Sequence, residues 1–117
     1  MEDSPAARGW IARLDDDVRG YAPELVWIEV AGALNRYVRA RHIAPAAAQE
    51  VLHNVTRLPL NVWRLQGIAS PALRAAVASR MSVYDACYVV IAQSLGATLV
   101  TADRRLATAV SDAELIQ

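Results

Sequence analysis

The sequence predicts an α/β domain in which a short parallel sheet is flanked by helices. Three observations favour this class: helical patterns outnumber strand-like runs, the strand-like runs are short, and helices separate them. A chain of 117 residues with 55% hydrophobic residues can bury a core and is too apolar to be disordered. We expect residues 1–117 to form one domain, with ligands at the carboxyl ends of its strands.

The first half of the chain predicts three helices. A serine followed by a proline indicates a first helix over residues 4–20, which ends at an acidic run and a glycine. A second, longer helix is expected over residues 23–41, buried at its apolar start and solvated at its arginine-rich end. A proline also indicates the start of a third helix, over residues 45–57.

The second half predicts strands alternating with helices. Short strands are expected where β-branched residues gather, and helices where an N-cap residue precedes an apolar pattern. In chain order we predict a strand at 61–65, helices at 70–80 and 82–95, a strand at 97–101, a helix at 103–110 and a last strand at 114–116. Ser82 caps the second of these helices, and Gly96 ends it.

Composition narrows the range of functions. The formal net charge is zero, which removes the strongest general argument for nucleic-acid binding, although a local basic face remains open. All 12 basic residues are arginine, so the chain lacks the lysine that a phosphoreceiver domain needs near its phosphate. No apolar run approaches the roughly 18 residues of a membrane span, and the first residues do not resemble a signal peptide. We expect a soluble, cytoplasmic protein that does not bind a membrane.

The single cysteine, Cys87, cannot form an internal disulfide, and no cysteine and histidine spacing resembles a zinc site. We expect Cys87 to be a core residue.

Three acidic residues stand in apolar segments: Glu29 in ELVWIEVAGAL, Asp85 in SVYDACYVVIA and Asp103 after ATLVTA. An unpaired buried carboxylate costs several kcal/mol, so three of them in a short domain indicate a shared counter-ion. A divalent metal ion is the counter-ion that we expect.

Each acid also has a structural interpretation. Ser82 and Asp85 have the spacing of a capping box, and Asp103 has the position of an N-cap for the helix after it. Glu29 is harder to explain in this way, because it lies in the middle of the predicted helix among apolar neighbours.

Two segments, APELVWIEVAGALNRYVR at residues 22–39 and SVYDACYVVIAQSLGATLVTADRRLA at residues 82–107, resemble the PIN domains of VapC-type toxin ribonucleases. The resemblance implies a PIN-like three-layer α/β fold. It also implies a Mg²⁺-dependent (or Mn²⁺-dependent) endoribonuclease that hydrolyses RNA phosphodiesters through a carboxylate-held metal. Glu29, Asp85 and Asp103 would then be the catalytic, metal-binding residues, and Thr101 a supporting neighbour.

The resemblance implies partners as well. Arg104 and Arg105, next to Asp103, and Arg36 and Arg39, beyond Glu29, are the candidate RNA-binding residues, although a solvated helix face is the favoured explanation of these arginines. Toxins of this type bind a small cognate antitoxin and commonly form homodimers, so we expect both.

PIN domains usually open with a strand that bears an aspartate, and this sequence lacks that strand. We expect that the start codon has been assigned too far downstream or that the chain is truncated. The alternatives are a short form that borrows a strand between protomers, and a catalytically silent PIN-like module that retains surfaces for antitoxin binding or self-association.

Overall fold

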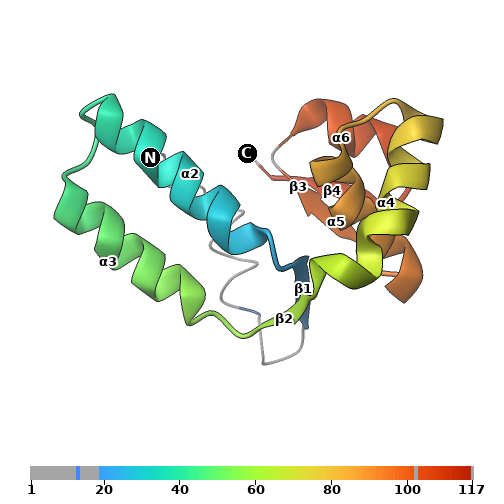
Figure 1. Cartoon of the computed structure of the whole chain (residues 1–117), viewed down its shortest axis with the longest axis horizontal. Helices are drawn as coiled ribbons and strands as arrows, with labels where there is room; N and C mark the ends of the chain where they lie inside the picture. Colours follow the sequence, from blue (N-terminus) through green and yellow to red (C-terminus); the bar gives the residue numbers. More distant parts are fainter. Residues whose placement is uncertain (1–12, 14–18, 102, 117) are drawn as a thin grey trace.

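The computed structural model describes residues 13, 19–101 and 103–116 (Figure 1). The first predicted helix, over residues 4–20, lies outside the described residues except at Arg13, Arg19 and Gly20. Gly20, its predicted end, belongs to a strand instead.

Four short strands form two parallel pairs. Strand β1 (Gly20–Pro23) pairs with β2 (Leu60–Trp63), and β3 (Leu99–Thr101) pairs with β4 (Ala113–Leu115). The predicted parallel strands are therefore present, but they form two separate two-stranded sheets in the described part of the chain.

Strand β1 was not predicted, because Pro23 was interpreted as the start of a helix. In the structure Pro23 ends the strand, and the backbone N–H of Glu24 donates to the carbonyl of Trp63 at 2.8 Å. A proline without an N–H is tolerated at a strand end. Helix α2 (Val26–Arg39) begins only after this turn, so Glu29 lies in its first turn, and not in mid-helix as predicted.

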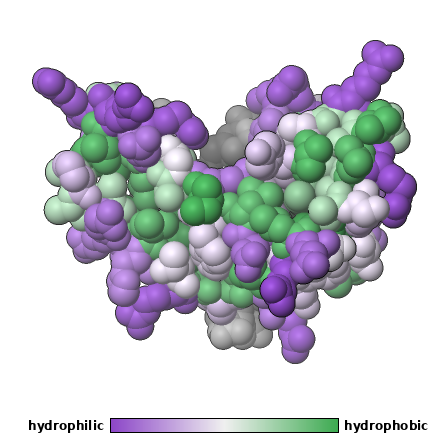
Figure 2. Space-filling model, viewed as in Figure 1, coloured by the Kyte–Doolittle hydropathy of each residue, from purple (hydrophilic) through white to green (hydrophobic). Residues whose placement is uncertain are grey.

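Helices α2 and α3 (Pro45–Thr56) pack against each other as a hairpin that projects from the rest of the molecule (Figure 1). Helix α3 begins at Pro45, as predicted. In Figure 2 the surface is hollowed between this hairpin and the part of the molecule that contains α4 to α6.

Helices α4 (Leu65–Ser79) and α5 (Val83–Leu95) enclose most of the core. Ala72 and Ala86 are fully buried, and such small side chains let the two helices approach closely. Cys87 is buried and free, which confirms the prediction that it is a core residue.

The predicted start of α4 at residue 70 was wrong, because the helix continues through Pro71 to an earlier start. Pro71 cannot donate to the carbonyl four residues back, and its ring crowds that group. The residue four positions before Pro71 is Gly67, which has no side chain and has open space where a Cβ would be.

The end signals of α5 are confirmed. The Ser82 hydroxyl accepts the Asp85 backbone N–H at 3.0 Å, and Gly96 terminates the helix with φ of +61°. The short helix α6 (Arg104–Ala109) follows β3.

We expect Gly96→Ala to lower the free energy of unfolding by about 1 kcal/mol, because a Cβ is strained at this left-handed φ. Gly67→Ala is the matched control, since it adds a methyl group to open space inside a helix and should be stabilising. Denaturant unfolding measures both, and equal effects of the two substitutions would contradict this account.

No single helix in the described ranges is long and apolar enough to cross a membrane. Helices α4 and α5 meet the length and composition criterion only as a pair, with a bend of 107° between them.

Candidate active site

Asp85 lies in the first turn of α5, where the positive end of the helix dipole favours a carboxylate. Its backbone N–H is satisfied by Ser82, which is one half of the predicted capping box. The other half is absent: among the described residues the Asp85 carboxylate accepts no hydrogen bond. Asp85 is half-buried, so a polar ligand can reach this carboxylate.

Glu29 faces α5 from the first turn of α2. The Tyr88 hydroxyl of α5 donates a hydrogen bond to Glu29 Oε1 of α2, and the two residues are 59 positions apart in sequence. Glu29 is exposed, and the described residues include no buried charged side chain, so the prediction of three buried carboxylates is wrong. The hydrogen bond to Tyr88 satisfies one Glu29 oxygen, and no described residue donates a hydrogen bond to the other.

Tyr88 is a neighbour of the candidate site residue Glu29 that the sequence interpretation missed. Burial raises the pKa of its hydroxyl most, followed by the hydrogen bond to Glu29 and the negative charges of Glu29 and Asp85. Of the two carboxylates, only that of Glu29 is hydrogen-bonded to the phenol. The missed signal is the position of Tyr88 three residues after Asp85, which puts both side chains on one face of α5.

Asp103 occupies the N-cap of α6, as the structural interpretation predicted. Its Oδ1 accepts the backbone N–H groups of Arg105 and Leu106 at 2.9 and 3.3 Å. The Thr101 hydroxyl accepts the backbone N–H of Asp103 at 3.0 Å, so Thr101 supports the position of this residue. Asp103 Oδ2 accepts no hydrogen bond from a described residue.

The structure joins Glu29 to Tyr88, three residues after Asp85 on α5, but it does not gather three ligands among the described residues. Among residues 13, 19–101 and 103–116, no three acidic, histidine or cysteine side chains lie close enough to share one metal ion. The chemistry of the available oxygens nevertheless suits Mg²⁺, which takes hard carboxylate ligands, retains several waters and needs only one or two carboxylates. Joint coordination by Glu29, Asp85 and Asp103 stays a prediction.

The four candidate RNA-binding arginines are all exposed, at two separate places. Arg104 and Arg105 open α6 directly after Asp103. Arg36 and Arg39 lie in the last turn of α2, about 10 to 15 Å along the helix axis from Glu29. The first pair is therefore better placed to contact a substrate at the Asp103 carboxylate.

The pH dependence of stability tests whether Tyr88 becomes buried beside Glu29 on folding. A phenol whose pKa is raised on folding contributes stability that is fully present below the unfolded pKa of about 10 and is lost as the pH rises above it. We expect the unfolding free energy of the wild type to fall more steeply above about pH 10 than that of Tyr88→Phe. Ultraviolet titration should show less tyrosinate in the native than in the unfolded protein at about pH 11, and identical curves would contradict a raised pKa of Tyr88 in the folded protein.

The sequence matches the PIN domain family over residues 1–110. It is 33% identical over 107 residues to ribonuclease VapC12 of Mycobacterium tuberculosis, covering 92% of this chain and 81% of that protein. It is 32% identical over 88 residues to VapC ribonuclease Mb0985 of Mycobacterium bovis, covering 75% of this chain and 68% of that protein.

The fold is similar to the crystal structure of PAE2754 from Pyrobaculum aerophilum, with a TM-score of 0.72 and 28% sequence identity. That match covers 96% of this chain and 84% of the other. The matches in sequence and in fold span nearly the whole chain and agree with the helix-rich α/β architecture with short parallel strands. The chain therefore belongs to the PIN domain family and is a protein of the VapC ribonuclease type.

Proposed function

We propose that this chain is a Mg²⁺- or Mn²⁺-dependent endoribonuclease of the VapC toxin type. The observation that carries the proposal is the half-buried Asp85 carboxylate, which lies in the first turn of α5 and accepts no hydrogen bond from the described residues. A half-buried carboxylate without a hydrogen-bond partner costs folding free energy, and a ligand that binds it would offset this cost.

Asp85 and Asp103 would hold the metal ion, and Glu29 would hold the metal or orient the attacking water. The ion, when bound, would activate water and neutralise charge on the phosphoryl oxygens. Tyr88 fixes Glu29 Oε1, which leaves Oε2 to accept a hydrogen bond from that water. No histidine or cysteine nucleophile is needed, and burial, followed by the charge of Glu29, raises the pKa of the Cys87 thiol and keeps it protonated.

The proposed partners are RNA, a small cognate antitoxin and a second copy of the chain. Arg104 and Arg105 would contact RNA phosphates near Asp103, because guanidinium groups bind phosphate oxygens in pairs. An antitoxin would cover the same carboxylates, so it would compete with the metal ion and the RNA. Arg36 and Arg39 would extend the RNA surface along α2.

An RNA cleavage assay tests the proposal. We expect the purified full chain to cut single-stranded RNA in the presence of Mg²⁺ or Mn²⁺, and expect a chelator to stop cleavage reversibly. Arg104→Ala and Arg105→Ala should raise the KM for RNA more than they lower kcat, because they contact only phosphates. Cleavage that continues unchanged in the presence of chelator would contradict the role of the metal.

A second candidate function is a catalytically silent PIN-like module that retains antitoxin-binding or self-association surfaces. It is favoured by the absence of a three-residue metal cluster among the described residues. This module would show neither saturable Mn²⁺ binding nor cleavage, and Asp85→Asn would leave its self-association unchanged. Mn²⁺ titration of the wild type and Asp85→Asn separates the two functions.

A further inference from the structure

Tyr84 is an exposed aromatic residue directly before Asp85 in the first turn of α5. Residues 84, 85 and 88 are neighbours on the helix surface, because 84 and 88 are four positions apart and 85 and 88 are three apart. Tyr88 is the residue whose hydroxyl bonds Glu29. Tyr84 therefore borders Asp85 and lies one helical turn from the contact that holds Glu29.

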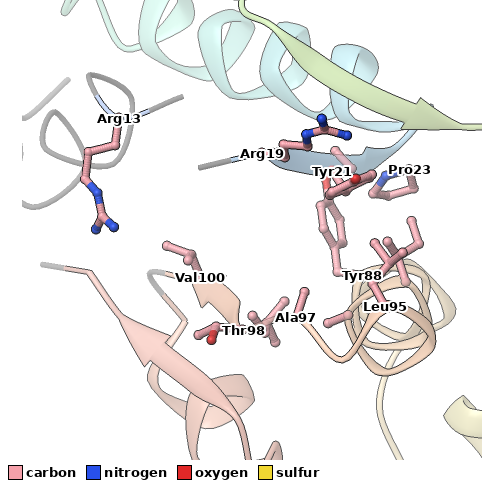
Figure 3. A pocket seen from close by; sticks show the side chains of 14 residues that line it. Arg13, Arg19, Tyr21, Pro23, Tyr88, Leu95, Ala97, Thr98 and Val100 are labelled. Carbon is pink, nitrogen blue, oxygen red and sulfur yellow. The ribbon is translucent and has the colours of Figure 1, made fainter. Parts of the chain in front are cut away.

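The rings of Tyr84 and Tyr88 have different surroundings. Tyr88 is half-buried and lines a cavity together with Leu95 of the same helix (Figure 3). Tyr84 is 67% exposed, and no described residue forms a hydrogen bond or a ring contact with it. The buried residues Ala86 and Cys87 supply the core side of this turn, so α5 does not need the Tyr84 ring for packing. The ring is therefore available to a planar ligand.

Arg80 supplies a positive charge in the turn between α4 and α5, where only Met81 separates it from Ser82, the N-cap of α5. It is exposed and has a left-handed φ of +53°, a conformation for which α5 uses Gly96. Arginine in this conformation is less stable than glycine, so backbone geometry alone does not explain it. No described residue pairs with its guanidinium, and residues 51–84 contain no aspartate or glutamate. The charge is therefore available to an anion.

We propose that Tyr84 and Arg80 form a nucleotide subsite, in which the tyrosine ring stacks on an unpaired RNA base and the guanidinium binds a neighbouring phosphate. The inference rests on the proposed function and adds a substrate class, namely RNA whose bases are unpaired beside the cleaved bond. A base inside a duplex is already stacked on both faces, whereas an unpaired base can stack on the ring. Since every base has such a face, the subsite selects for an unpaired strand and not for one base.

Fluorescence of an RNA that contains the adenine analogue 2-aminopurine tests the stacking directly. The probe is a single strand of about twelve nucleotides with one central analogue, whose emission falls when its ring stacks on an aromatic side chain. Binding to the full chain is measured with a chelator at low salt, so that metal-dependent cleavage does not occur and phosphate contacts are strong.

We expect the wild type and Tyr84→Phe to quench the emission, because both have the ring. Tyr84→Leu should not quench it and should bind the probe about tenfold more weakly. The same strand annealed to its complement should also bind more weakly to the wild type. Thermal unfolding of the three proteins should be similar, because the side chain of Tyr84 is exposed.

A pair of arginine variants tests the phosphate contact. Arg80→Asn removes the guanidinium and keeps a residue type that tolerates the left-handed backbone. We expect it to weaken RNA binding by about threefold to tenfold. Arg74→Gln is the matched control, since it removes the same charge from the same helix, where the guanidinium donates to the Ser70 hydroxyl. Its RNA affinity should change by less than about twofold.

Three outcomes would overturn the proposal. The first is equal quenching, or none, by the wild type and Tyr84→Leu, and the second is equal affinity of the wild type for the single strand and the duplex. The third is a Tyr84→Leu variant that binds RNA normally but no longer self-associates, because the ring would then belong to a protein contact. A wild type that stacks the base but does not cleave RNA would contradict the proposed nuclease and support the subsite.

Discussion

Replacing Asp85 by asparagine is expected to lower kcat for RNA cleavage by about a hundredfold to a thousandfold and to weaken Mn²⁺ binding in parallel. The substitution removes the charge but keeps the shape. Ser82 caps α5 through the backbone N–H of residue 85, which asparagine retains, so the start of the helix should be unchanged. Cleavage, Mn²⁺ affinity and thermal unfolding of the same preparations measure the effect.

Two controls separate site chemistry from folding. Glu50→Gln removes an exposed carboxylate of α3 and should change neither cleavage nor metal affinity. Asp103→Asn should preserve the cap of α6, because asparagine is an equally good N-cap, while it removes the charge from the proposed site. Wild-type cleavage by both Asp85→Asn and Asp103→Asn would refute the assignment of these carboxylates.

The elements that the sequence predicted well have their start and end signals nearby in the chain. Helix α5 is predicted from Ser82 to Gly96 because a serine hydroxyl caps its start and a glycine takes the left-handed conformation at its end. Asp103 could be interpreted as an N-cap for the same reason, since a carboxylate reaches the backbone N–H groups two and three residues later. These interactions depend only on residues within one turn.

Strand β1 could not be predicted, because its main stabilising contacts are distant. Its four residues pair with β2, which is 40 positions further along, and Pro23 is compatible with both a helix start and a strand end. The position of Glu29 changed for the same reason: α2 starts later than the proline indicated, which moves this acid into the first turn and onto an exposed surface.

The candidate site was predicted as residue types but not as an arrangement. Glu29, Asp85 and Asp103 could be chosen because charge is unusual in apolar segments, yet the contact between Tyr88 and Glu29 joins helices that only tertiary packing brings together.

Ile68→Ala is expected to lower the free energy of unfolding by about 2 to 5 kcal/mol, a large part of the roughly 5 to 15 kcal/mol that stabilises a domain of this size. Ile68 is only 3% exposed and packs in the cluster that joins α4 to α5, where the neighbours Ala72 and Ala86 are too small to fill the space that it leaves. Val77→Ala is the control on the same helix: Val77 is 72% exposed, so its truncation should change stability by less than about 0.5 kcal/mol. Denaturant unfolding should show a lower midpoint for Ile68→Ala alone, and equal midpoints would mean that the contact between α4 and α5 is not the main source of stability.

Because Asp85 and Tyr88 both project from α5, loss of this contact should also weaken the proposed metal site, so cleavage by Ile68→Ala should decline at temperatures where Val77→Ala remains active.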